Sequence, residues 1–153
     1  MATARRAEPA ARALHVAEPP PLFTQRPLAV VDASVIAALL FAEPDQAVAE
    51  RTLAACQPVA PDLLAYELGN VAVDKLRCGH AEAAVRAGLA DFEALDITLH
   101  PIGAVPAFDM AARYGLTAYD AAYLVLAAQL RCALFTFDTR LADAARKHFG
   151  TAA

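Results

Sequence analysis

A short hydrophobic run that ends in an acid and passes directly into an apolar segment restricts the possible folds most strongly. Ala29, Val30 and Val31 are followed by Asp32, and the apolar segment 33–42 begins immediately after it. A strand without polar alternation is typical of a parallel sheet that is buried on both faces. Open sheets of this kind bind their ligands at the carboxyl ends of the strands. The pattern therefore predicts an α/β fold with Asp32 at a candidate site.

Strand-like and helix-like segments alternate from Leu28 onward. We expect strands at residues 28–31, 59–60, 97–101 and 133–137. We expect helices at residues 34–41, 44–56, 62–77, 80–95, 104–114, 117–131 and 139–149, with Asp62 as the cap of the third. Such alternation is typical of a parallel sheet between two layers of helices. The sequence thus predicts one three-layer α/β/α sandwich domain with a central parallel sheet over residues 28–149, and a short tail at 150–153.

Residues 1–27 differ from this pattern. They contain five of the ten prolines and little periodicity, so we expect a disordered N-terminal extension. No continuous apolar segment follows its arginines, which argues against a signal peptide. No apolar run in the chain approaches the roughly 18–20 residues of a membrane span. The three cysteines are widely spaced and odd in number, which suits a reducing cytoplasm rather than a disulfide framework or a zinc site.

The chain is mildly acidic, with a formal net charge of −4. Without residues 1–26, the remainder holds 9 basic and 15 acidic residues. This balance excludes a strongly basic protein that coats nucleic acid. It still permits an enzyme that acts on nucleic acid with acids that bind metal.

Three of the four candidate site acids have a structural alternative. Asp138 repeats the setting of Asp32, because it follows an apolar strand and precedes a helix, and either acid could simply cap that helix. Asp120 follows Thr117 at the spacing of a capping box. The helix that Asp120 begins has no charged side chain in its next two turns, so it is buried on most sides. Burial of this helix would direct Asp120 toward the interior.

Glu67 is harder to explain as a structural residue, because it lies inside a predicted helix where no cap is needed. At 100° per residue, Leu63, Leu64 and Val71 lie within about 60° of it, so Glu67 belongs to the apolar stripe. A carboxylate turned toward a core costs several kcal/mol unless it is paired or bound to a metal. The alternative is a glutamate at the rim of the core that reaches solvent.

Convergence of these four acids would require a counter-charge. Two unit charges about 4 Å apart repel by ~4 kcal/mol at an effective dielectric near 20. Oxygen-only ligands suit Mg²⁺ or Mn²⁺, and such an ion can promote in-line displacement at a phosphate. Ser34 and Thr136 lie two residues from Asp32 and Asp138. Their hydroxyls could orient a site group or satisfy the backbone, and we favour the second role for Thr136.

Several short motifs resemble those of one enzyme family in order and spacing. They are Val-Val-Asp32-Ala-Ser34, Glu67-Leu-Gly-Asn70, Thr117-Ala-Tyr-Asp120-Ala-Ala-Tyr123 and Thr136-Phe-Asp138. With these motifs the chain resembles the PIN-domain nucleases, and most closely the VapC-type toxins of bacterial type II toxin–antitoxin modules. The resemblance spans residues 28–149.

The resemblance implies a metal-dependent endoribonuclease that forms a homodimer and is held inactive by a cognate antitoxin. By motif match, Asp32, Glu67, Asp120 and Asp138 correspond to the acidic metal site of the family. Ser34 and Asn70 match frequent polar neighbours of that site. Some members carry another acid two residues after the position of Asp138. This chain has Arg140 there and so departs from the pattern of a second metal position.

Two alternatives stay open at this point: a non-catalytic binding or scaffold module of the same fold, and a nuclease that acts on DNA. A phosphoacceptor receiver-like domain would need a lysine after a late strand, and neither Lys75 nor Lys147 has that setting. A haloacid-type phosphatase would need a second acid two residues after Asp32, where the chain has Ser34.

Overall fold

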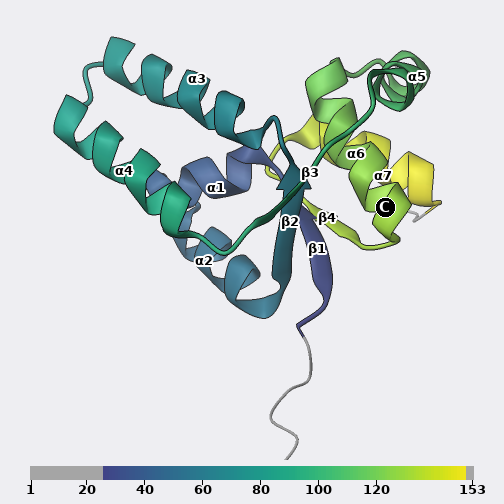
Figure 1. Cartoon of the computed structure of the whole chain (residues 1–153), viewed down its shortest axis with the longest axis horizontal. Helices are drawn as coiled ribbons and strands as arrows, with labels where there is room; N and C mark the ends of the chain where they lie inside the picture. Colours follow the sequence, from purple (N-terminus) through teal and green to yellow (C-terminus); the bar gives the residue numbers. More distant parts are fainter. Residues whose placement is uncertain (1–25, 151–153) are drawn as a thin grey trace, which may run out of the picture.

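A four-stranded, entirely parallel sheet forms the centre of the protein, and its computed structural model describes residues 26–150 (Figure 1). The strand order is β3-β2-β1-β4. The predicted extension over residues 1–27 lies almost entirely outside the described residues, as do residues 151–153 of the predicted tail. The strands are β1 (Leu28–Val31), β2 (Gln57–Pro61), β3 (Thr98–His100) and β4 (Ala133–Phe135).

Seven helices in the described part of the chain cover the two faces of this sheet. Helices α1 to α4 lie on one side and α5 to α7 on the other (Figure 1), which confirms the predicted three-layer sandwich. None of the described helices is long and apolar enough to span a membrane. The helices are α1 (Ala33–Leu40), α2 (Gln46–Ala55), α3 (Leu64–Arg77), α4 (Glu82–Ala94), α5 (Ala104–Tyr114), α6 (Ala118–Leu130) and α7 (Thr139–Phe149).

Strand β2 spans Gln57–Pro61 and is therefore longer than the predicted 59–60, with a proline near each end. Pro58 pairs with Ala29 of β1, beyond the point where β3 begins to pair, and Pro61 pairs only with His100 of β3. Proline is tolerated where one edge of a strand is unpaired. Pro58 and Pro61 therefore fit within this strand.

The predicted cap at Asp62 is wrong. The cap of helix α3 is Leu63, one residue later than predicted, and it makes no side-chain hydrogen bond there. The backbone N–H of Asp62 instead donates to the carbonyl of His100 at 2.9 Å, as an extension of the sheet. This bond holds Asp62 outside the first turn of the helix.

Helix α6 is buried on all sides, as predicted from its apolar sequence. Every residue from Ala121 to Ala127 is buried, and the helix packs on β1, β2 and β4. The register places Val31 of β1 opposite Phe135 of β4, so both strands end at the same level. The residues that follow them, at the carboxyl edge of the sheet, therefore meet.

Candidate active site

Asp32 is the most rigidly held of the candidate acids. It caps α1 with Oδ1, which accepts from the backbone N–H of Ser34 at 3.1 Å and of Val35 at 3.3 Å. The Ser34 hydroxyl also donates to Oδ1, at 2.6 Å, and the Thr136 hydroxyl donates to Oδ2 at 2.7 Å. The capping interpretation is therefore confirmed for Asp32, but capping uses only one of its two oxygens.

The two hydroxyls connect the ends of β1 and β4. Ser34 Oγ accepts from the backbone N–H of Phe137 at 2.9 Å, and Thr136 Oγ1 accepts from that of Asp138 at 2.8 Å. Thr136 thus satisfies the backbone, as predicted, and also orients a carboxylate. Burial raises the pKa of the Asp32 carboxyl, and hydrogen bonds from its neighbours offset only part of this rise.

Glu67 points from α3 toward α6, where the Tyr123 hydroxyl donates a hydrogen bond to Oε2. The predicted apolar stripe is present, since Leu64 is fully buried and Leu63 and Val71 pack against the core. Glu67 itself is half-buried, so it does not simply extend into solvent at the rim of the core. Burial raises the pKa of its carboxyl, the charges of Asp120 and Asp32 raise it further, and the Tyr123 hydrogen bond opposes them.

Asp120 lies in the first turn of α6 and is half-buried. The Thr117 hydroxyl accepts from the Asp120 backbone N–H at 3.1 Å and donates to Asp120 Oδ2 at 2.7 Å. The capping prediction is confirmed for Thr117. Asp120 is close enough to Glu67 for its charge to raise the pKa of that carboxyl.

Asp138 lies at the edge of this group. It is exposed and caps α7, with Oδ1 accepting from the backbone N–H of Arg140 at 2.7 Å and of Leu141 at 3.1 Å. Its connection to Asp32 runs through Thr136. Asn70 is exposed one turn beyond Glu67. The structure therefore brings Asp32, Glu67 and Asp120 together and leaves Asp138 and Asn70 at the periphery.

Tyr123 is the site residue whose role the sequence analysis missed. It is the only polar residue in the buried stretch 121–127, and its hydroxyl needs a partner there. It also follows Asp120 by three residues, which places both on one side of α6. Burial and the charge of Glu67 raise the pKa of Tyr123, so its hydroxyl keeps the proton and remains a donor.

The three inner acids suit a hard divalent cation by chemistry and by charge. Among residues 26–150, no Lys or Arg forms an ion pair with any of them. Oxygen-only donors with uncompensated negative charge are typical of Mg²⁺ and Mn²⁺ sites. The described residues contain no three acidic, His or Cys side chains already spaced to hold an ion. Each acid accepts from a hydroxyl instead, so shared coordination would require rotation of the Glu67 and Asp120 side chains toward Asp32.

A parallel α/β fold with acids at the carboxyl edge of its sheet is shared with a known protein family. The sequence pattern of the PIN domain matches residues 29–147. The chain is also 35% identical over 120 residues to Ribonuclease VapC3 of Pyrobaculum aerophilum, which covers 74% of this chain and 92% of that protein. The chain therefore belongs to the PIN domain family, within its VapC-type group.

Two solved structures share the fold. The Pyrobaculum aerophilum protein PAE2754 superposes with a TM-score of 0.63 at 27% identity, over 80% of this chain and 87% of that one. VapC20 of Mycobacterium tuberculosis, described as a toxin that cleaves the sarcin-ricin loop, superposes with a TM-score of 0.57 at 19% identity, over 76% of this chain and 94% of that one. The second likeness supports the fold alone.

Proposed function

We propose that this protein is a Mg²⁺- or Mn²⁺-dependent endoribonuclease that acts in the cytoplasm as the toxin of a toxin–antitoxin pair. The observation that carries the proposal is that Asp32 and Asp120 lie close enough to Glu67 for their charges to raise its pKa, while no basic residue among those described pairs with any of the three. A relative named as a ribonuclease, matched over 92% of its length, supports RNA as the substrate.

Asp32 would position the ion. Three of its hydrogen bonds go to Oδ1 and one goes to Oδ2, so Oδ2 has the greater remaining capacity to bind a cation. Because β1 and β4 both fix this side chain, little reorganisation is needed at Asp32 when an ion binds. Pre-organised ligands of this kind favour both metal affinity and precise placement of the phosphate.

Glu67 and Asp120 would complete the set of ligands from the helical layers. The Tyr123 hydroxyl occupies Glu67 Oε2 and leaves Oε1 open. Since its pKa is raised, Glu67 releases its proton less readily than an ordinary carboxyl, and it must do so to bind the cation, so metal binding should weaken at low pH. When bound, Mg²⁺ or Mn²⁺ would supply Lewis acidity that activates water and stabilises charge on the phosphate.

Four further polar residues have supporting roles in this proposal. Ser34 and Thr136 hold Asp32 in place through their hydroxyls. Asp138 lies at the rim and acts through Thr136, and Asn70 lies exposed on α3, one turn beyond Glu67. A cognate antitoxin would block the acidic site with a basic segment, and the homodimer is carried over from the family resemblance.

The test is a nuclease assay with purified protein on matched single-stranded RNA and DNA. We expect RNA to be cut in Mg²⁺ or Mn²⁺ and to stay intact in excess chelator. A non-catalytic module would leave both substrates intact under every condition. Cleavage of DNA alone would contradict the choice of substrate.

A further inference from the structure

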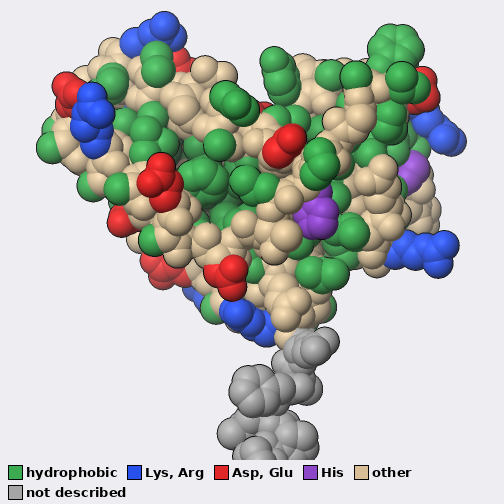
Figure 2. Space-filling model, in the orientation of Figure 1, with side chains coloured by type: hydrophobic (Ala, Val, Ile, Leu, Met, Phe, Trp, Pro, Cys, Tyr) green, Lys and Arg blue, Asp and Glu red, His purple; other side chains and the backbone are tan. Residues whose placement is uncertain are grey.

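A cation-lined pocket lies between the end of α5 and α7. It has a volume of about 540 Å³ and is lined by Arg113, Arg140 and Lys147, with Asp143 as its one acid. Asp143 forms an ion pair with Arg146, so its charge is already compensated. Figure 2 shows Lys or Arg side chains on this side of the molecule. The pocket therefore carries net positive charge in a protein whose overall charge is −4.

The two guanidinium groups of this pocket are held in place without using a carboxylate. Arg140 Nη2 donates to the carbonyl of Gly115 at 2.8 Å. The Arg113 guanidinium lies over the ring of Tyr114, 5.5 Å from its centroid. Within residues 26–150, neither arginine nor Lys147 forms an ion pair with an acid. Pre-oriented guanidinium groups with free donors are well suited to bind phosphate.

The position of the pocket relates it to the reaction. Arg140 follows Asp138 by two residues. Leu116, which also lines the pocket, immediately precedes Thr117, whose hydroxyl binds Asp120. The pocket lining therefore includes residues of α7 and of the α5–α6 connection that lie close in sequence to Asp138 and Thr117. A polyanion that places one phosphate at the acids with a cation would bring another toward these basic side chains.

We propose that this pocket binds a backbone phosphate of RNA next to the scissile one. The inference rests on the proposed function, and it assigns Arg113, Arg140 and Lys147 to substrate positioning. RNA is favoured over an acidic peptide because a relative matched over 92% of its length is named as a ribonuclease. The position that other members give to an acid, here Arg140, then serves the substrate instead of a second ion.

The test measures binding of a fluorescent single-stranded RNA in chelator, across a series of salt concentrations. Arg113→Gln and Lys147→Gln, singly and combined, are compared with wild type. For single strands, the slope of log K against log salt changes by about 0.7 for each phosphate contact. We expect the double variant to bind RNA more weakly than wild type and to show a smaller salt-dependence slope. Arg113→Lys, which keeps the positive charge, should retain the wild-type slope. Arg140 is left unchanged because it also binds the α5–α6 connection.

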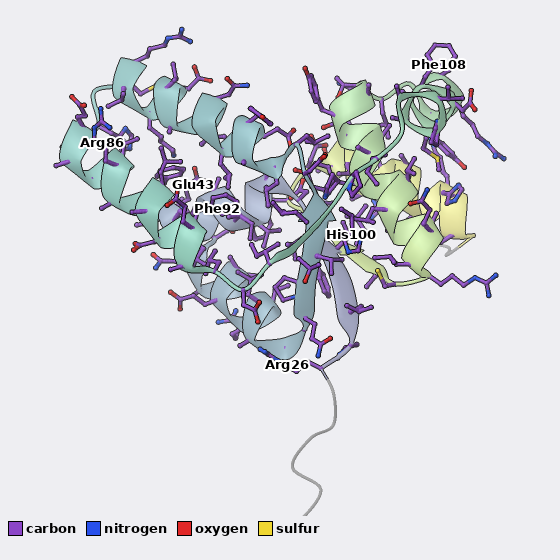
Figure 3. The ribbon with its side chains drawn as sticks, viewed as in Figure 1. Arg26, Glu43, Arg86, Phe92, His100 and Phe108 are labelled. Atoms are coloured by element: carbon purple, nitrogen blue, oxygen red, sulfur yellow. The ribbon has the colours of Figure 1, made fainter. Side chains whose placement is uncertain are left out.

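Arg86→Gln is the matched control. Arg86 lies on α4, on the opposite side of the sheet from this pocket (Figure 3), and within residues 26–150 its one ion pair is with Glu82 at 2.8 Å. It should bind RNA like wild type. The assignment is overturned if the double variant keeps the wild-type slope, if Arg86→Gln loses as much, or if wild type shows no salt-dependent RNA binding.

The cleavage assay separates this inference from the proposed function. If wild type cuts RNA but the double variant binds it unchanged, the pocket assignment fails and the nuclease proposal stands. If binding depends on the pocket but no cleavage occurs in Mg²⁺ or Mn²⁺, the nuclease proposal fails and the phosphate site stands. If the double variant loses binding to poly-glutamate as strongly as to RNA, the site is a general anion patch and the assignment is overturned.

Discussion

The hydroxyl of Tyr123 on α6 donates to the carboxylate of Glu67 on α3, and so connects the two helical layers across the carboxyl edge of the sheet. This contact joins residues 56 positions apart in the chain. It turns Glu67 away from solvent and toward Asp32 and Asp120, whose charges both act on it. The acidic site therefore depends on a neutral phenol as well as on its carboxylates.

Replacement of Tyr123 by Phe tests this connection through the pH dependence of cleavage. The hydrogen bond from Tyr123 lowers the pKa of Glu67, so its loss should raise that pKa further. We expect the acid limb of the pH–rate profile to move to higher pH. Tyr66→Phe is the control, because Tyr66 is 79% exposed. An unshifted acid limb in Tyr123→Phe would show that Glu67 does not limit the rate at low pH.

Glu67→Gln tests whether the metal-free site is a source of repulsion. The folded-state pKa of Glu67 is raised above its ordinary value of 4.5, so the folded protein binds its proton more tightly than the unfolded chain does. The protonated Glu67 carboxyl therefore contributes to the free energy of unfolding fully below pH 4.5, and this contribution is lost as the pH rises through the raised folded-state pKa. The melting temperature of Glu67→Gln relative to wild type should therefore increase between pH 4.5 and pH 7 in chelator.

Glu93→Gln, on the exposed surface of α4, is the matched control for this measurement. Its difference from wild type should vary little over the same pH range. A Glu67→Gln variant that became relatively less stable with rising pH would contradict the electrostatic account of the site.

Two substitutions at Asp138 separate helix capping from catalysis. Asparagine caps a helix nearly as well as aspartate, whereas alanine costs about 1 kcal/mol. We expect Asp138→Asn to keep the wild-type melting temperature and to lose cleavage rate by roughly 10–100-fold, as for a residue that supports a metal ligand. Asp138→Ala should lose stability as well. Full cleavage activity of a folded Asp138→Asn variant would show that Asp138 only caps α7 and takes no part in cleavage.

Gly88 tests the packing of α4 on the end of α1. A Cβ atom added there would lie 2.9 Å from the carbonyl oxygen of Leu40 and 2.9 Å from Cε1 of Phe41. Gly88→Ala should therefore lower stability by about 1–3 kcal/mol, as overpacking does. Gly69→Ala, which meets no atom within 4 Å, should raise it by about 0.5–1 kcal/mol. Denaturant titrations that gave Gly88→Ala and Gly69→Ala the same change in the free energy of unfolding would contradict this packing.

Local patterns were enough to predict the fold and the positions of the acids. Asp32 and Asp138 follow apolar strands, and parallel strands that end at one edge bring such residues to one side. Glu67 was placed correctly on the apolar stripe of α3 by helical periodicity alone. These features depend on neighbours within a turn or a strand, which the sequence displays directly.

Contacts between distant segments could not be predicted in the same way. The bonds from Tyr123 to Glu67 and from Thr136 to Asp32 depend on how the layers pack, and no local pattern specifies that. The capping role of Asp138 is local by contrast: its setting between a strand and a helix predicted it, and the side chain does cap α7.

The central claim is that Asp32 and Asp120 bind the ion that promotes RNA cleavage. The most direct measurement is the rate of RNA cleavage as a function of Mn²⁺ concentration for wild type, Asp32→Asn and Asp120→Asn. Asp74→Asn is the control, since Asp74 is exposed on α3 and pairs with Arg77. We predict that wild type and Asp74→Asn cut RNA alike, and that the folded Asp32 and Asp120 variants stay inactive at every Mn²⁺ concentration. Cleavage by both of those variants at the wild-type rate would contradict the account.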